Sequence, residues 1–170
     1  MPNGQIQYLL EAGCGYPGDI PQQVQAGSVG SIVSGIPLGK ALGQQYVLPL
    51  ATGTPVVGTD YMAGISTTLS TDTVSTDGTV SVSRLVPGII YLITPLNPTA
   101  FFGSSWPTTP SQATYNSLVG ARVLFDLTGG VYTITNTDGS TNGLVVENLD
   151  ISRFPGVVAF SIRQAVAYTN

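Results

Sequence analysis

Glycine and proline interrupt the chain along its whole length. Its 170 residues include 21 glycines and 12 prolines. No stretch of about 12 residues shows an apolar face of helical period without one of them. The segments between them are rich in valine, isoleucine, threonine and aromatic residues, which favour strands. Turn signals every 8 to 12 residues or so are typical of sandwiches and barrels. The sequence therefore predicts an all-β fold: a compact β-sandwich or β-barrel of short antiparallel strands with an extended N-terminal arm.

Three turns are predicted to connect neighbouring strands. The clearest is Thr128-Gly129-Gly130, because two glycines between the alternating runs of residues 121–135 allow the positive φ angles of a tight hairpin. A second hairpin is predicted around Thr76-Asp77-Gly78, with 73–75 facing 79–86. A third turns through the polar loop 136–143. The other expected strands lie at 28–33, 46–50, 89–94, 144–147 and 157–163.

Three stretches are not expected to form the core. Residues 1–26 contain several glycines and prolines and only one brief apolar run, which predicts an extended N-terminal arm. Residues 35–45 are small and glycine-rich, which predicts a loop. Residues 95–112 combine four prolines with three aromatic residues, which predicts an aromatic loop. Residues 27–170 would then form one β-domain, with a possible subdivision near 95–112.

Charged residues are scarce. Aspartate, glutamate, lysine and arginine make up 8 % of the chain, against roughly 25 % in an average soluble protein, and there is no histidine. The net charge is −4 and the arginines are scattered, which argues against a nucleic-acid partner. No run approaches the roughly 18 apolar residues of a membrane span, so no membrane partner is expected. Such a neutral surface suits a protein that is assembled or lies outside the cell.

The motifs that could carry chemistry are incomplete. Residues 13–18 match the dinucleotide-binding pattern G-x-G-x-x-G, but Pro17 and Pro21 lie where its helix should begin. Residues 35–40 are one position short of a phosphate-binding loop. Without histidine, a nucleophile lacks its usual base, although paired carboxylates stay open as an alternative. Most aspartates lie at predicted turns; calcium binding within 138–142 is the alternative there. We expect no enzyme activity, cofactor or metal site.

A resemblance to a known family starts from the segment Leu48-Pro49-Leu50-Ala51-Thr52-Gly53-Thr54-Pro55-Val56-Val57-Gly58 and the following Ala63-Gly64-Ile65-Ser66. With the Gly- and Pro-rich arm and the low charge, this pattern resembles the head decoration, or cement, proteins of tailed bacteriophages. The resemblance implies a virion protein on the capsid exterior, made in the host cytoplasm. It implies binding to the major capsid protein and to neighbouring copies of the chain, as a trimer, and stabilisation of the shell. The alternative is a carbohydrate- or receptor-binding β-module of a phage tail or fibre.

The N-terminal arm supplies the first set of expected contacts with the capsid or a neighbouring subunit. Its apolar run, with Ile6, Tyr8, Leu9 and Leu10, is too short to form a core alone. A strand in this run would leave backbone groups unpaired unless it joined a sheet. We expect it to add to an exposed sheet edge of a partner. The alternative is that Tyr8, Leu9 and Leu10 belong to the domain's own core.

The aromatic loop supplies the second set. Phe101, Phe102 and Trp106, held between prolines, can present the exposed aromatic surface that a protein or sugar partner needs. The alternative is that they fold back and cap one end of the barrel.

Overall fold

Antiparallel strand pairing accounts for nearly all the regular structure. The computed structural model describes residues 7–9, 19–28, 32–41 and 43–167. One five-stranded sheet has the order β2 (Asp19–Val24), β6 (Gly78–Ser83), β5 (Asp60–Ser66), β3 (Pro37–Ala41) and β4 (Leu48–Pro49). The other has the order β1 (Gln7–Leu9), β7 (Ile90–Ile93), β12 (Val158–Ile162), β11 (Leu144–Val146) and β8 (Arg122–Val123). β9 (Phe125–Thr128) and β10 (Val131–Ile134) form a separate hairpin. The predicted all-β fold class is confirmed.

The first sheet closes into a small barrel. Tyr46, just before β4, forms a parallel bridge with Gln23 of β2, and the Val47 amide donates a hydrogen bond to the Gln23 carbonyl at 2.9 Å. Along β6, Val80 and Val82 are buried, while Thr79 and Ser81 beside them are more exposed. This alternation is what a closed sheet requires. The barrel interior is filled by Val24, Ile32, Leu38, Val47, Ala63, Val80 and Val82.

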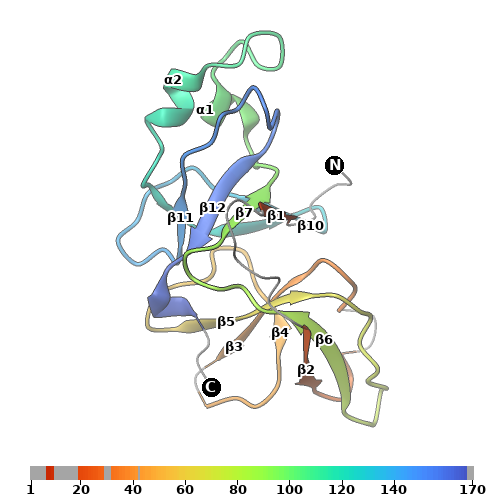
Figure 1. Cartoon of the computed structure of the whole chain (residues 1–170). Helices are drawn as coiled ribbons and strands as arrows, with labels where there is room; N and C mark the ends of the chain where they lie inside the picture. The colour runs from red at the N-terminus through yellow and green to blue at the C-terminus, as the bar shows by residue number, and fades with distance from the viewer. Residues whose placement is uncertain (1–6, 10–18, 29–31, 42, 168–170) are drawn as a thin grey trace.

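The second sheet and the β9–β10 hairpin form a similar ring. β8 is followed almost at once by β9, and the Leu96 amide after β7 donates to the Ile134 carbonyl of β10 at 3.2 Å. Strand pairing runs from β7 through β12 and β11 to β8, and the chain then continues from β8 into the β9–β10 hairpin. A bridge between Pro95 and Ile134 connects β10 back to the end of β7. Its core includes Tyr91, Phe125 and Phe160, whose neighbouring rings lie 5.6 Å apart. Figure 1 shows this second barrel above the first.

Apolar packing joins the two barrels although each has its own core cluster. Leu50, Met62 and Ile65 belong to the first barrel but pack into the apolar cluster of the second. The backbone after β4 also leaves the first barrel and pairs with the second: the Phe125 amide donates to the Thr54 carbonyl at 2.7 Å, and the Gly143 amide to the Pro55 carbonyl at 2.9 Å. The barrels are therefore joined by backbone hydrogen bonds as well as by apolar packing.

The predicted turns have different outcomes. The Gly129-Gly130 hairpin forms as expected, with φ of 60° and 78° at its two central residues. Around Thr76-Asp77-Gly78 the chain does turn, but β6 is faced by residues 67–71, not by 73–75. The loop 136–143 precedes β11 as expected, yet β11 pairs with β12 and β8, so this loop is not a hairpin. That pairing is long-range and leaves no local signal.

The expected strands also differ in outcome. Those at 46–50, 89–94, 144–147 and 157–163 correspond to β4, β7, β11 and β12. The strand expected at 28–33 falls partly outside the described residues, and its described positions are not in a strand.

The small-residue segment 35–45 was expected to be a loop, and this is corrected by β3 (Pro37–Ala41). β3 pairs with both β4 and β5 inside the first barrel. Its small residues serve close packing: a Cβ on Gly39 would lie 2.5 Å from a Leu50 methyl carbon and 3.1 Å from the Tyr61 carbonyl. Glycine in a strand often marks such an approach.

The predicted N-terminal arm, 1–26, contains two strands, β1 and β2, and both pair with other strands of the chain. β1 pairs with β7, and all six residues of β2 pair with β6. Val24 is fully buried inside the first barrel. β2 therefore belongs to the β-domain, although the sequence predicted that this domain begins at residue 27.

Two short helices interrupt the otherwise all-β chain. α1 (Pro98–Phe102) begins with proline in its first turn, a position that proline favours, and α2 (Gln112–Asn116) is capped by Ser111, whose side chain accepts from the Thr114 amide. Both lie at the end of the second barrel remote from the first (Figure 1). A 3₁₀ turn, η1 (Gln164–Val166), follows β12. Among the described residues, no helix is long and apolar enough to cross a membrane.

Substituting Gly64→Ala should destabilise the first barrel strongly. Gly64 has φ of +145°, and a Cβ there would lie 2.2 Å from the Ser83 carbonyl oxygen on β6. We expect the free energy of unfolding to fall by about 3 kcal/mol, because backbone must move. Gly58→Ala is the matched control: its φ is +85° but no atom lies within 4 Å, so a loss of about 1 kcal/mol is expected. Urea unfolding measures both; equal losses would contradict the close approach of β5 and β6.

Candidate interaction surface

Phe101 and Phe102 are fully buried, which corrects the expectation of an exposed aromatic surface. Both come from α1 and pack into the core of the second barrel. The Phe102 ring lies 4.6 Å from the Trp106 ring and 6.2 Å from the nearly parallel Tyr115 ring of α2. Trp106 is half-buried, and its ring lies beside Gly156. A Cβ added to Gly156 would lie 3.2 Å from the Cζ2 atom of Trp106. The aromatic residues therefore fold back and cap the barrel, which was the alternative arrangement.

The expected contact residues of the N-terminal arm are only partly described. Ile6 and Leu10 lie outside the described residues. Tyr8 and Leu9 are in β1, where they pair with Tyr91 and Ile90 of the same chain. At these described positions the backbone joins a sheet of its own chain, and the expected contact of these residues with a partner stays a prediction.

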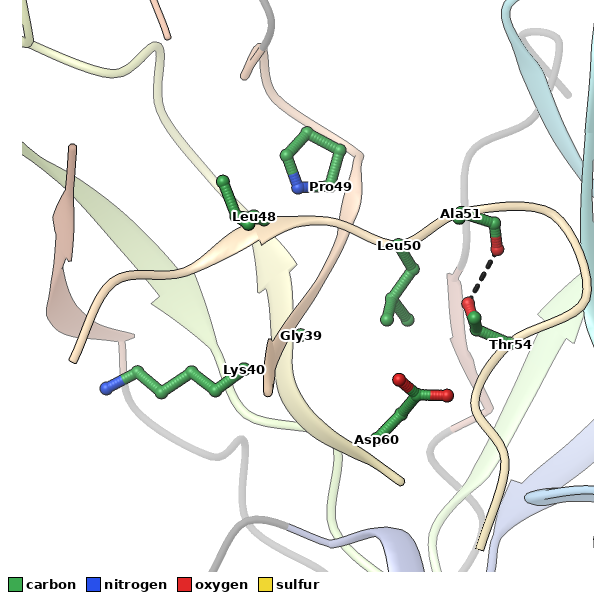
Figure 2. A pocket seen from close by; sticks show the side chains of 8 residues that line it. All are labelled: Gly39, Lys40, Leu48, Pro49, Leu50, Ala51, Thr54 and Asp60. Atoms are coloured by element: carbon green, nitrogen blue, oxygen red, sulfur yellow. Dashed lines mark hydrogen bonds between the residues drawn. The ribbon is translucent and has the colours of Figure 1, made fainter. Parts of the chain in front are cut away.

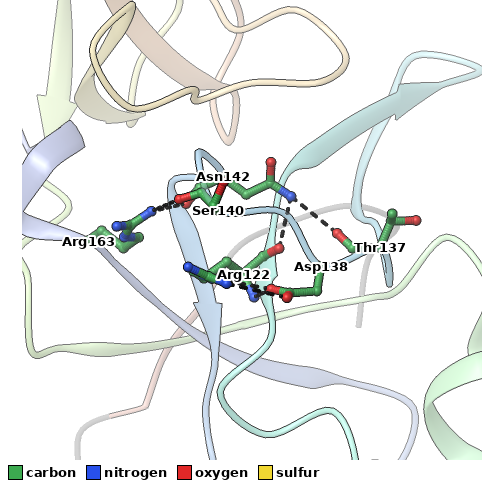
Figure 3. Close-up of polar contacts among 6 residues, drawn as sticks. All are labelled: Arg122, Thr137, Asp138, Ser140, Asn142 and Arg163. Carbon is green, nitrogen blue, oxygen red and sulfur yellow. Dashed lines mark hydrogen bonds and ion pairs between the residues drawn. The ribbon is translucent and has the colours of Figure 1, made fainter.

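The polar loop 136–143 is held by charged and amide side chains (Figure 3). Asp138 accepts from the Arg122 amide at 2.7 Å and faces the Arg122 guanidinium, with Nε at 3.3 Å. These hydrogen bonds, the backbone one first, lower the pKa of Asp138 below its usual value. Asn142 donates to the Arg122 and Thr137 carbonyls, and Arg163 donates to the Ser140 and Asn142 carbonyls. This hydrogen-bond network holds the loop in place.

Other carboxylates also hold loops in place through hydrogen bonds. Asp77 accepts from the Ala26 amide and from the Tyr46 hydroxyl, and these bonds lower its pKa. Asp150 accepts from the hydroxyl and amide of Ser152, which lower its pKa too. Aspartate is favoured at turns for such bonds. Among the described residues, no group of three or more histidine, cysteine, aspartate or glutamate side chains could hold a metal ion.

A cavity of about 180 Å³ lies where β3, β4 and the start of β5 meet (Figure 2). Leu50 points into it, the Lys40 ammonium extends away from the Asp60 carboxylate, and an Asp60 oxygen accepts from the Val56 amide at 2.9 Å. Specific ligand sites use several convergent polar groups. The walls of this cavity are mainly aliphatic, so it suits a small apolar group. It is lined by Gly39, Lys40, Leu48, Pro49, Leu50, Ala51, Thr54 and Asp60.

Three aliphatic side chains are exposed on adjoining loops of the first barrel: Val33 (46 %), Leu69 (60 %) and Val74 (84 %). Their loops are joined by hydrogen bonds from the Gly27 amide to the Thr73 carbonyl at 2.8 Å and from the Ser70 amide to the Ile32 carbonyl at 3.2 Å. In Figure 1 the loop 67–77 projects from the first barrel, away from the second. The sequence did not indicate their exposure, because isolated valine and leucine among threonines also suit a half-buried strand.

Comparison of the chain with protein-family models, with curated proteins and with solved structures found no match.

Tyr115 and Tyr132 connect separate parts of the structure through buried hydroxyls. The Tyr115 hydroxyl donates to the Glu147 carbonyl at 2.9 Å and accepts from the Ala159 amide at 3.0 Å. The Tyr132 hydroxyl, in the second barrel, donates to the Leu50 carbonyl of the first barrel at 2.6 Å. Burial raises the pKa of each to about 12 from 10.0. Both groups are therefore held in the protonated form.

We expect stability to fall in alkali. Because the pKa of both tyrosines is raised to about 12 in the folded chain, the unfolded chain loses these protons from about pH 10 while the folded chain retains them. The stabilisation is complete below pH 10 or so and is lost as the pH rises towards 12. Urea unfolding at a series of pH values should show this decline in the wild type. Tyr132→Phe should reduce the decline, because it removes one of the two hydroxyls whose pKa is raised. An equal decline in Y132F and wild type would contradict the assignment.

Proposed function

We propose that the protein is a structural, non-catalytic component of a bacteriophage particle. On this proposal it binds the outer surface of the capsid, contacts the major capsid protein and stabilises the shell. Shell stability increases when a second protein bridges neighbouring subunits, because each bridge buries surface that was exposed to water.

The observation that carries the proposal is the scarcity of charge on the surface. Several of the charged side chains present are hydrogen-bonded to backbone groups of the loops. Asp77 and Asp138 fasten loops, and Arg122 and Arg163 bind loop carbonyls or Asp138. Charged residues make up only 8 % of the chain, so a partner that covers the surface strips water from few charges. Such desolvation is the main cost of burying a charged surface. This supports a role in which large areas are buried against other proteins.

A carbohydrate- or receptor-binding module of a tail or fibre is less well supported. That alternative depended on exposed Phe101, Phe102 and Trp106, and the first two are fully buried. The cavity beside β4 is lined by no aromatic residue on which a sugar ring could stack. No other observation favours this function.

We propose in addition that neighbouring copies associate on the shell, as the trimer that the family resemblance implies. A symmetric oligomer matches a symmetric lattice, because each copy then meets the same shell surface.

The decisive experiment measures copy number and position in purified virions of the phage that encodes the chain. Quantitative mass spectrometry should find the protein in a number comparable to the capsid protein, and antibody labelling of intact particles should place it on the head. Particles that lack it should release their DNA at a lower temperature, and adding the purified protein back should restore the difference. A handful of copies at the tail would support the tail module instead, and absence from the virion would overturn the proposal.

A further inference from the structure

The cavity between β3, β4 and the start of β5 combines aliphatic walls with a carboxylate. Leu50 points into it, and Leu48, which also lines it, has 51 % of its surface exposed. The Asp60 carboxylate faces the Leu50 side chain across the cavity (Figure 2). An entirely apolar occupant would take water from this carboxylate without offering it a partner. An occupant that satisfies the whole cavity therefore needs an aliphatic part and a cationic end.

Asp60 is held in position before any ligand binds. Its Oδ2 atom accepts a hydrogen bond from the Val56 amide at 2.9 Å, and its own amide donates to the Val56 carbonyl at 3.0 Å. These two bonds close the turn that leads into β5. In the part of the chain that the structure describes, the Oδ1 atom accepts no hydrogen bond. One oxygen is thus open to a donor, and its fixed position reduces the entropy that binding would cost.

A single open oxygen favours an ammonium group over a guanidinium group. Arginine binds a carboxylate best through two parallel hydrogen bonds, one to each oxygen, and the Val56 amide already occupies Oδ2 of Asp60. An ammonium group is a compact point charge, which can donate one hydrogen bond to Oδ1 and the others to water. A lysine side chain also carries an aliphatic stem, which suits the aliphatic walls.

The size of the cavity favours one side chain over a free small molecule. Sites for drug-sized molecules have volumes of roughly 300–1,000 Å³, and this cavity has about 180 Å³. A free polyamine would bring a second ammonium group, and Asp60 is the only carboxylate among the described residues that line the cavity. Lys40 also lines it, but the Lys40 ammonium extends away from Asp60 (Figure 2).

A second copy of the chain is poorly suited to supply the lysine. Lys40 is the only lysine in the sequence, and it already has an interaction within its own chain. The net charge of −4 also makes the approach of a positively charged surface more favourable than the approach of another copy. A lysine of a different protein fits these observations better.

We infer that this cavity binds the side chain of one lysine of a protein partner. The ammonium group donates to Oδ1 of Asp60, and the stem packs against Leu48 and Leu50. This inference goes beyond the proposed function and does not depend on it, because it specifies the chemistry of the contact and not the identity of the partner.

Titration of the full chain with blocked amino acids, followed by NMR, tests the inference. The probe is a lysine with an acetylated amino end and a methylamide at the carboxyl end, so that only the side chain is charged. Blocked norleucine has an aliphatic stem without the ammonium group, and blocked arginine carries a guanidinium group. The lysine probe should bind about fivefold more tightly than blocked norleucine, and also more tightly than blocked arginine. The signals of Leu48, Leu50 and Asp60 should shift.

Three variants locate the binding. Asp60→Asn should weaken binding of the lysine probe about fivefold, because asparagine keeps an acceptor for the Val56 amide but lacks the charge. Leu48→Ser should weaken it about twofold to threefold by removing aliphatic wall. Asp150→Asn is the matched control: it also removes a carboxylate, exposed on the second barrel, and binding should be unchanged. Melting temperatures should stay close to that of the wild type.

Other results would overturn the inference. Blocked norleucine could bind as tightly as the lysine probe, or the lysine probe could fail to saturate by about 50 mM. Spermidine binding more than about tenfold tighter than the probe would assign the cavity to a free polyamine. If Lys40→Met and Asp60→Asn each reduced self-association in analytical ultracentrifugation, Lys40 of a second copy would be the occupant. None of these measurements uses capsids, so the proposed function and the inference fail separately.

Discussion

The backbone that leaves β4 connects the two barrels, and the rest of the structure depends on it. Loop carbonyls buried in a core must find hydrogen-bond donors. Here the Thr54 and Pro55 carbonyls receive them from Phe125 and Gly143 of the second barrel. Tyr132 adds a bond in the same region by donating to the Leu50 carbonyl. The orientation of the barrels is therefore fixed by directional bonds, and apolar packing of Met62 and Ile65 fills the space around them.

Features that depend on local chemistry could be predicted from the sequence, and those that depend on distant partners could not. The Gly129-Gly130 turn was predictable because two adjacent glycines permit the backbone angles that this hairpin needs. β3 was not, because Gly39 reads as a loop residue until Leu50 and the Tyr61 carbonyl are placed against it. β11 had a visible strand pattern, but its partners β12 and β8 are set by long-range packing.

The same limit applies to the candidate site. Phe101 and Phe102 were identified as important, but their direction depends on α1, which places both in the core. Prolines that were expected to hold an exposed loop instead include Pro98 in the first turn of α1. Leu69 and Val74 give no signal in the sequence, because each stands alone among hydroxyl residues. Their exposure follows from the loop 67–77, which long-range backbone bonds tie to β6 and to Gly27.

The rigid connection of the barrels also bears on the proposed association with a shell. The bonds from Phe125, Gly143 and Tyr132 hold both barrels to one backbone segment, so each copy of the chain presents its surfaces in a fixed geometry. A symmetric capsid repeats one surface at constant intervals. If copies associate on it as proposed, several contacts form together only where the spacing of the shell matches that geometry, and any other surface meets one weak contact at a time. On the proposed function, selectivity for the assembled shell over the free capsid subunit would then follow from the rigidity of the barrel junction, and not from the strength of any one contact.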